Sequence, residues 1–322
     1  MEAIEVRQLM NEWGAAGIPY LFIIDLEQRK PLIFRLSEID NTELLYEVQS
    51  QTNFSERPFS SAISFTRHPE SFESYAAKFD VVCNHLRRGD SYLLNLTSRT
   101  PITLDRPLRA LFGSTDAKYK LWLKDRFIVF SPETFVRIES GKIYSHPMKG
   151  TIAAEIPNAE QILLNDAKEL AEHYTIVDLI RNDLSMVAEH VRVEKFRYID
   201  KLQTNQKDLL QVSSVISGEL PNDHLSRLGE IIFSLLPAGS VTGAPKKRTL
   251  EIIQEVEGSE RGYYTGVFGL FDGSSVDSAV IIRYIEDTSE GLIFRSGGGV
   301  TISSDAQTEY QEMIDKVYVP LR

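Results

Sequence analysis

Cysteine is almost absent from this sequence, because Cys83 is the only one among 322 residues. A single thiol cannot close an internal disulfide, and it cannot supply a metal site built from several thiolates. Such a composition is typical of proteins that work in a reducing compartment. We therefore expect a cytoplasmic protein.

Basic residues are also few relative to acidic ones. The chain has 35 Lys and Arg against 46 Asp and Glu, which gives a formal net charge of −11. A chain with this charge repels phosphate backbones. We therefore expect no nucleic-acid partner.

Long hydrophobic runs are missing as well. The apolar run at 20–24 is far shorter than the roughly 20 residues that a membrane-spanning helix needs. The first five residues, Met1 to Glu5, lack the basic and apolar regions of a signal peptide. Repeats, low-complexity tracts and flexible linkers are absent too. We expect no membrane partner and a single domain over residues 1–322.

The sequence does contain many short strand patterns with helices between them. Apolar residues at helical spacing predict helices over 74–88 and 159–184, a third that opens at Pro245, and a last one that Ser304 and Gln307 cap. Short apolar runs predict strands at 20–24, 32–34, 92–97, 127–130, 262–271, 278–285 and 292–296. This mixture predicts an α+β (mixed α/β) fold with a large sheet system.

Two pairs of glutamates lie three residues apart on predicted helices, Glu169 with Glu172 and Glu309 with Glu312. Side chains at positions i and i+3 share a helix face, so each pair brings two like charges together. A hard cation would offset this repulsion, and carboxylate oxygens suit Mg²⁺. The alternative is a solvated acidic helix face, which any single pair of this kind favours.

Two glycine-rich stretches indicate a close approach of the backbone to a ligand. Residues 237–246 lead into a helix N-terminus, where backbone N–H groups attract an anion. Gly297, Gly298 and Gly299 follow a predicted strand, where the lack of a side chain permits such an approach. Each stretch alone is equally compatible with a tight turn, whereas the two together indicate a small anionic ligand.

Further side chains near these stretches have both a chemical and a structural interpretation. Lys149, beside a Gly-Thr turn, becomes a nucleophile if it is buried, because desolvation disfavours the ammonium form. A strand–turn–strand segment would bring Glu133 to the same site. Arg283, with Tyr264, can clamp a carboxylate. The structural alternatives are a turn glutamate, a surface lysine, and an ion pair of Arg283 with Asp277 or Asp287.

Taken together, these stretches resemble the chorismate-utilising enzymes, which include anthranilate synthase component I, aminodeoxychorismate synthase component I, isochorismate synthase and salicylate synthase. The resemblance covers roughly residues 70–320 and is strongest to aminodeoxychorismate synthase component I. It implies one large domain with two stacked β-sheets flanked by helices and a site in a central cleft. Residues 70–320 would form the chorismate-binding catalytic core, and residues 1–69 would complete the sheets.

The branch within that family is indicated by the stretch Pro147-Met148-Lys149-Gly150-Thr151. It is similar to the Pro-Ile-Lys-Gly-Thr of aminodeoxychorismate synthases, whereas anthranilate synthases carry alanine in place of the lysine. Isochorismate and salicylate synthases place a basic lysine at the position that corresponds to Leu93, and leucine cannot activate water. The resemblance therefore implies that Lys149 serves in covalent attack.

The resemblance also implies a reaction sequence. Lys149 attacks C2 of chorismate as the C4 hydroxyl leaves, and Glu133 is the acid or base that assists this departure. Ammonia then adds at C4 and expels the lysine, which gives 4-amino-4-deoxychorismate on the route to para-aminobenzoate and folate.

Binding roles follow from the same resemblance. Mg²⁺ would bind the ring carboxylate of chorismate and be held by Glu172, Glu309 and Glu312, with Glu169 nearby. Arg283 and Tyr264 would bind the enolpyruvyl carboxylate. The remaining hydrogen-bond donors would be Gly150, Thr151, Thr242, Gly297, Gly298 and Gly299.

The nitrogen source implies a partner. Cys83 lies in a helical stretch rather than on a nucleophile elbow, so the ammonia is expected from a separate glutamine amidotransferase subunit. The chain also departs from many relatives, which have a histidine where Gln211 stands; an amide can hydrogen-bond but cannot shuttle a proton at neutral pH. Two alternatives stay open, an anthranilate synthase component I and a non-catalytic subunit that only binds chorismate.

Overall fold

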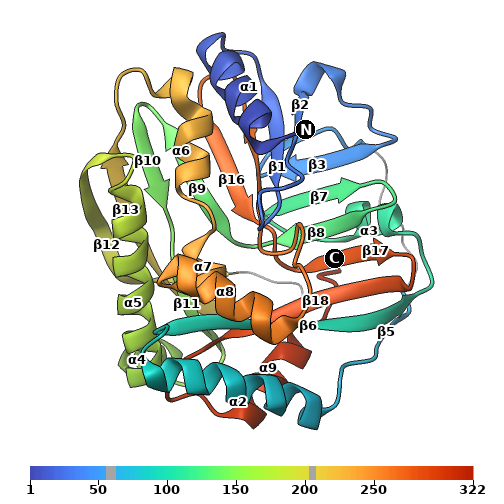
Figure 1. The fold of residues 1–322 in the computed structure, drawn as a ribbon, viewed down its shortest axis with the longest axis vertical. Coiled ribbons are helices and arrows are strands. Elements are labelled where there is room, and N and C mark those ends of the chain that lie inside the picture. Colours follow the sequence, from blue (N-terminus) through green and yellow to red (C-terminus); the bar gives the residue numbers. More distant parts are fainter. Residues whose placement is uncertain (56–62, 203–207, 322) are drawn as a thin grey trace.

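The first of two sheets runs through the left and centre of Figure 1. The computed structural model describes residues 1–55, 63–202 and 208–321, and over these residues this sheet has nine strands. In sheet order they are β11 (Met148–Ala153), β13 (Leu209–Glu219), β10 (Lys142–Ser145), β9 (Thr134–Glu139), β16 (Val276–Val280), β15 (Val267–Phe271), β1 (Tyr20–Ile24) and β2 (Leu32–Arg35), with β12 (Glu189–Leu202) beside β13.

The second sheet also has nine strands within the described ranges. In sheet order they are β14 (Gly243–Ala244), β6 (Leu93–Leu104), β18 (Gly291–Val300), β17 (Tyr284–Thr288), β8 (Phe127–Ser131), β7 (Tyr119–Leu123), β3 (Leu44–Val48) and β4 (Gln51–Thr52), with β5 (Phe65–Arg67) beside β6. Strands from the N-terminal residues 1–69 enter both sheets. The predicted α+β fold with two sheets flanked by helices is confirmed.

Helices cover the faces of the sheets that point away from each other. Against the first sheet pack α1 (Ala3–Ala15), α5 (Ala167–Leu184) and α6 (Leu228–Ser234), and against β6 and β18 pack α2 (Phe72–Arg88), α8 (Lys246–Glu257) and α9 (Ala306–Asp315) (Figure 1). The shorter helices are α3 (Leu108–Ser114), α4 (Ala159–Asn165), α7 (Gly239–Thr242), η1 (Leu36–Glu38) and η2 (His224–Arg227). Along the described chain no helix is both long and apolar enough to cross a membrane.

The strand β1 shows why the layers stack as they do. Its side chains alternate in direction, so Tyr20, Phe22 and Ile24 join the core under α1 and α6, while Leu21 and Ile23 join the core between the sheets. All five residues are buried. A continuous apolar run is what a strand covered on both faces requires. The short run at 20–24 therefore fixes β1 as a central strand of a layered fold.

Three predicted helix boundaries are wrong for reasons of capping. The helix predicted over 159–184 is interrupted, because the Asp166 carboxylate accepts from the Glu169 backbone N–H (2.9 Å) and starts α5 afresh. At the last helix the cap is Asp305, which accepts from the Thr308 N–H at 2.9 Å, rather than Ser304. Pro245 precedes α8 as its N-cap residue instead of opening the helix.

The strand predicted over 278–285 is wrong in a way that matters for the site. It is two strands in different sheets, with β16 ending at Val280 and β17 starting at Tyr284. Arg283 lies in the crossing and has φ +54°, a conformation that side-chain-bearing residues rarely adopt. The strand predicted over 262–271 is also shorter, since β15 starts at Val267.

Candidate active site

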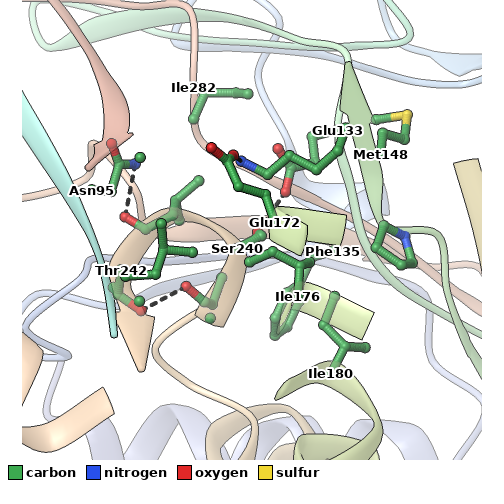
Figure 2. A pocket seen from close by; sticks show the side chains of 18 of the residues that line it. Asn95, Glu133, Phe135, Met148, Glu172, Ile176, Ile180, Ser240, Thr242 and Ile282 are labelled. Atoms are coloured by element: carbon green, nitrogen blue, oxygen red, sulfur yellow. Dashed lines mark hydrogen bonds and ion pairs between the residues drawn. The ribbon is translucent and has the colours of Figure 1, made fainter. Parts of the chain in front are cut away.

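A cavity of about 540 Å³ is lined by strands of both sheets, β11 of the first and β6 and β18 of the second, and by α5, α7 and α9. Figure 2 shows part of this wall, with residues of β6, β11, α5 and α7 labelled. Every residue that the sequence marked for chemistry, substrate or metal lines it. These residues are Glu133, Lys149, Gly150, Thr151, Glu169, Glu172, Thr242, Tyr264, Arg283, Gly297, Gly298, Gly299, Glu309 and Glu312. The fold thus brings them to one place, and their individual roles remain predictions.

Glu133 lies in the turn between β8 and β9. Its backbone N–H donates to Ser131 Oγ (3.1 Å), and Ser240 Oγ donates to its Oε1 (2.5 Å) (Figure 2). Burial raises the pKa of the Glu133 carboxyl, and the Ser240 hydrogen bond and the charges of Lys149 and Arg283 offset this only in part. A carboxyl group that keeps its proton to higher pH is suited to act as a general acid.

Lys149 lies on β11, whose pairing with β13 is broken by a bulge between Lys149 and Thr151. Gly150 adopts φ +71° at that bulge, which favours glycine. The Lys149 side chain is 24% exposed, and its Nζ is 3.3 Å from Glu172 Oε2. Lys149 is therefore partly buried and ion-paired rather than fully buried. An amine attacks only without its extra proton, so this ion pair must separate before Lys149 can act as a nucleophile.

The pair on α9 is held by its surroundings. Glu309 is 2% exposed and accepts a hydrogen bond from Ser304 Oγ (2.8 Å), and Glu312 pairs with Lys316 Nζ at 2.6 Å. A Cβ atom on Gly298 would lie 3.0 Å from Glu309 Oε2. The bare backbone of β18 therefore makes room for this carboxylate, and a solvated acidic face is excluded for Glu309.

The pair on α5 faces β11 in a similar way. Glu172 has a side chain that is 11% exposed and bound to Lys149. A Cβ atom on Gly150 would lie 3.2 Å from Glu169 Oε2. Both carboxylates thus lie against the strand that carries the predicted nucleophile.

The donor set of the four glutamates suits magnesium, because all of its donors are carboxylate oxygens. Within residues 1–55, 63–202 and 208–321, no group of three or more His, Cys, Asp or Glu side chains is gathered tightly enough to hold an ion. Two of the four carboxylates instead form ion pairs with lysines, Glu172 with Lys149 and Glu312 with Lys316. The residues fit the ion by their chemistry, and magnesium remains a prediction.

Arg283 and Tyr264 line the same cavity. The Arg283 guanidinium lies over the Tyr318 ring, 5.3 Å from its centroid, and among the described residues its Nε has no hydrogen-bond partner. Asp277, one of the partners proposed from the sequence, is instead 3.4 Å from Arg137. Burial raises the pKa of Tyr264 to about 12, so its hydroxyl stays a neutral donor. A partly buried cationic donor beside a neutral one is suited to bind a carboxylate.

The glycine-rich stretch at 237–246 contributes differently from the prediction. The cavity wall takes residues 238–243 from it, whereas Lys246 at the start of α8 pairs with Asp183 at 2.8 Å. The Thr242 hydroxyl donates to the Ala238 carbonyl (2.9 Å) and is already engaged. The short helix α7, rather than the N-terminus of α8, therefore faces the cavity.

Sequence reasoning placed Ser240 and Asn95 in stretches expected near the site, residues 237–246 and 95–97, but gave neither side chain a role. Asn95 Nδ2 donates to the Val241 carbonyl (3.0 Å), and its buried Oδ1 has no hydrogen-bond partner in the described part of the chain. On α5 but outside the cavity wall, His173 is fully buried with Nε2 2.6 Å from Ser214 Oγ, and burial lowers its pKa to about 4. No local sequence pattern marks these contacts, because each partner comes from a distant segment.

A family model described as chorismate binding enzyme matches residues 20–322. The chain belongs to the chorismate binding enzyme family. Among curated relatives, an "Uncharacterized PabA-like protein" of Haemophilus influenzae is 49% identical over 311 residues, which are 97% of this chain and 95% of the relative. Aminodeoxychorismate synthase component 1 of Klebsiella aerogenes is 30% identical over 322 residues, which cover 94% of this chain and 69% of the relative.

Solved structures of other chorismate enzymes have the same fold. Anthranilate synthase component I from Streptococcus pneumoniae is 29% identical with a TM-score of 0.67, over 81% of this chain and 60% of that chain. The menaquinone-specific isochorismate synthase from Escherichia coli is 14% identical with a TM-score of 0.72, over 98% of this chain and 81% of that chain, and this likeness concerns the fold alone. The chain is thus a chorismate-utilising enzyme of the anthranilate or aminodeoxychorismate synthase component I type.

Proposed function

We propose that this chorismate-utilising enzyme is an aminodeoxychorismate synthase component I, which makes 4-amino-4-deoxychorismate from chorismate and ammonia. The observation that supports this most is Lys149 on the wall of the cavity that Glu133 also lines. A covalent route needs an amine to attack and an acid to protonate the leaving oxygen at one site. In anthranilate synthases, which the chain also resembles, alanine replaces this lysine.

The chemistry proceeds in two displacements. Lys149 Nζ forms a bond to C2 of chorismate, the two ring double bonds shift, and the C4–O bond breaks. Glu133 gives its proton to that oxygen, which leaves as water. Ammonia then forms a bond to C4, the double bonds shift back, and the C2–N bond to Lys149 breaks. The Glu133 carboxylate takes the surplus proton of the new amine, which restores the starting enzyme.

The chain's other residues orient the substrate for this attack. Arg283 and Tyr264 bind the enolpyruvyl carboxylate, and the backbone of Gly297–Gly299 also lines the cavity. Glu172, Glu309 and Glu312, with Glu169 nearby, would hold a magnesium ion, which when bound would supply positive charge for the ring carboxylate. Binding of both carboxylates fixes the ring in the cavity and with it the positions of the reacting carbons C2 and C4. Orientation of this kind lowers the barrier to reaction.

The ammonia comes from a separate glutamine amidotransferase. The thiol of Cys83 is buried within α2, and burial raises its pKa. A thiol in such a place is a poor nucleophile, because the thiolate is the reactive form. The purified chain should therefore use ammonium salts and ignore glutamine, and an amidotransferase partner should confer the use of glutamine.

Anthranilate synthase component I is the second candidate, favoured by the pneumococcal structure that matches 81% of this chain. The two functions differ in their products. The test is incubation with chorismate, MgCl₂ and an ammonium salt, followed by chromatography and mass spectrometry. Formation of 4-amino-4-deoxychorismate supports the proposal, and anthranilate with pyruvate refutes it. Chorismate binding without turnover would instead indicate a non-catalytic subunit.

A further inference from the structure

The backbone of Glu133 is held on both sides, but its carboxyl group is held from a distant segment. Its N–H donates to Ser131 Oγ (3.1 Å), and its carbonyl accepts from the Val280 N–H (3.1 Å). The carboxyl receives the hydroxyl of Ser240, which is 107 residues away in sequence (Figure 2). A glutamate carboxyl rotates over a broad, roughly two-fold torsion. The Ser240 contact therefore decides which oxygen faces which way.

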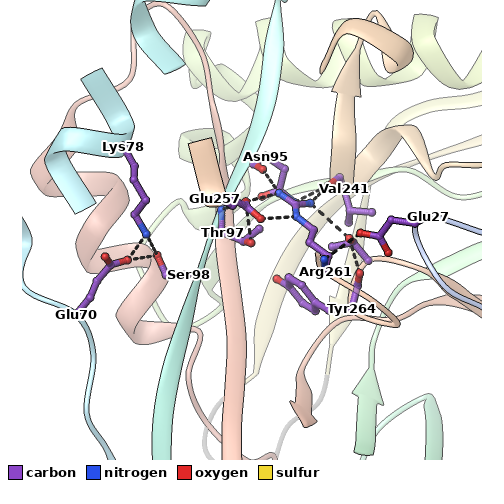
Figure 3. A network of polar contacts seen from close by, with 11 residues as sticks. Glu27, Glu70, Lys78, Asn95, Thr97, Ser98, Val241, Glu257, Arg261 and Tyr264 are labelled. Atoms are coloured by element: carbon purple, nitrogen blue, oxygen red, sulfur yellow. Dashed lines mark hydrogen bonds and ion pairs between the residues drawn. The ribbon is translucent and has the colours of Figure 1, made fainter. Parts of the chain in front are cut away.

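Ser240 is itself fixed by its neighbours on α7. The carbonyl of Val241 accepts from Asn95 Nδ2 (3.0 Å) and from Arg261 Nη1 (3.2 Å). Arg261 is 1% exposed and is anchored by Glu257 at 2.6 Å, as Figure 3 shows. A buried guanidinium with several hydrogen bonds is costly to displace. The helix α7, which carries Ser240, is thus held in place by hydrogen bonds that connect it to the second sheet and to α8.

We propose that Ser240 is a positioning residue that assigns separate tasks to the two oxygens of Glu133. The Ser240 hydroxyl donates to Oε1, so Oε1 is kept as an acceptor and Oε2 is left to carry the acidic proton. That proton moves from Oε2 to the C4 oxygen as the C4–O bond breaks, and the Ser240 hydrogen bond stabilises the carboxylate that remains. This inference rests on the proposed function, because it assigns a partner to its general acid.

A purely structural hydrogen bond would give a different experimental result. Its removal would lower the stability of the protein but would not change catalysis through Glu133. The chain offers a matched control in Ser217, a buried serine whose Oγ donates to Glu194 Oε1 at 2.6 Å outside the cavity wall. Ser217→Ala removes the same kind of contact with no path to the predicted chemistry.

The experiment compares Ser240→Ala, Ser240→Thr and Ser217→Ala in the ammonium-dependent reaction, with kcat and KM for chorismate measured separately and Tm recorded for each. Ser240→Ala should lower kcat by roughly ten- to a hundredfold. General acids contribute about 10²–10⁴-fold, and this variant keeps the Glu133 carboxyl but removes the hydrogen bond that orients it. KM should change less than about twofold. Threonine keeps the hydroxyl and should restore most of kcat. Ser217→Ala should match the wild type.

A double-mutant cycle makes the test specific to Glu133. In a Glu133→Gln background, Ser240→Ala should cause almost no further loss of kcat, because the group that it positions is gone. The inference is overturned if Ser240→Ala keeps full kcat, if its loss equals that of Ser217→Ala, or if threonine fails to restore activity. Independent losses from the two variants would overturn it as well. A wild-type enzyme with no aminodeoxychorismate formation refutes the proposed function instead, and the inference falls with it.

Discussion

The helices α5 and α9 present the same arrangement to the cavity, each against a different strand. On each helix two glutamates lie three residues apart, the first facing a glycine of a neighbouring strand and the second pairing with a lysine. On α5 the glutamates are Glu169 and Glu172, opposite Gly150 and Lys149, and on α9 they are Glu309 and Glu312, opposite Gly298 and Lys316.

The two lysines differ in how they are held. Lys316 follows Glu312 by four residues, lies 2.6 Å from it, and also donates to the Gly297 carbonyl at 2.9 Å. Lys149 comes from a separate strand, 23 residues from Glu172, and its contact is longer at 3.3 Å. A lysine with two short contacts braces the strand and the helix that it joins. Lys149 is tied less firmly, which suits the nucleophile that it is proposed to be, so we expect the same pattern to serve structure on one side and chemistry on the other.

The largest effect should come from Lys149→Ala. We expect kcat for aminodeoxychorismate to fall roughly a thousandfold or more, because the variant has no amine to attack C2. Folding should persist, since the side chain is partly exposed and already faces a cavity rather than the packed core. Product formation by chromatography and a thermal melt would check both statements. Full activity in this variant would remove the covalent route and the distinction between the two lysines.

Removal of metal should have the next largest effect and should affect both helices alike. EDTA should suppress turnover, and Glu172→Gln on α5 and Glu309→Gln on α9 should each raise the Mg²⁺ concentration for half-maximal activity by roughly tenfold, because each loses a charged ligand. Glu43→Gln is the control, since it removes a carboxylate from an exposed pair with Lys124. Equal turnover of chorismate with and without EDTA would end the magnesium prediction on both sides.

Lys316→Met should have a smaller effect than Lys149→Ala. We expect kcat to fall by roughly tenfold, because Glu312 and the Gly297 carbonyl lose a shared charged donor while the chemistry keeps its amine. Methionine retains most of the side-chain volume, so packing is preserved. A loss as large as that of Lys149→Ala would show that the two sides of the cavity are not divided into structure and chemistry.

The sequence predicted which residues line the cavity better than it predicted the contacts between their side chains. The residues that carry the resemblance occur in long ordered motifs, so their gathering in one cavity could be expected from the family fold. The Lys149–Glu172 pair and the Ser240–Glu133 hydrogen bond join segments 23 and 107 residues apart. No local pattern encodes such pairs, because side-chain geometry across a cleft depends on how the elements pack.

Errors in the predicted elements have equally specific causes. The apolar residues Ile281 and Ile282 are compatible both with a strand that continues along one sheet and with a chain that crosses to the other. The run at 278–285 therefore gave no sign of the crossing at Arg283. Ser304 and Asp305 are both good N-cap residues. Asp305 takes the cap while the Ser304 hydroxyl serves Glu309, and only the tertiary structure distinguishes these uses.

The smallest effects should come from the two glycines that face the first glutamate of each pair. Gly150 has φ +71°, so Gly150→Ala should lower the free energy of unfolding by about 1–2 kcal/mol through backbone strain. Gly298 lies within the regular pairing of β18 with β6, where alanine strains the backbone little, but its new Cβ would lie 3.0 Å from Glu309 Oε2. Gly298→Ala should therefore change stability by less than about 1 kcal/mol and instead raise the Mg²⁺ concentration for half-maximal activity a few-fold. Urea unfolding and Mg²⁺ titration of activity on both variants measure the two quantities. If Gly298→Ala proves the more destabilising change and leaves the Mg²⁺ dependence untouched, Glu309 does not take part in the proposed magnesium site.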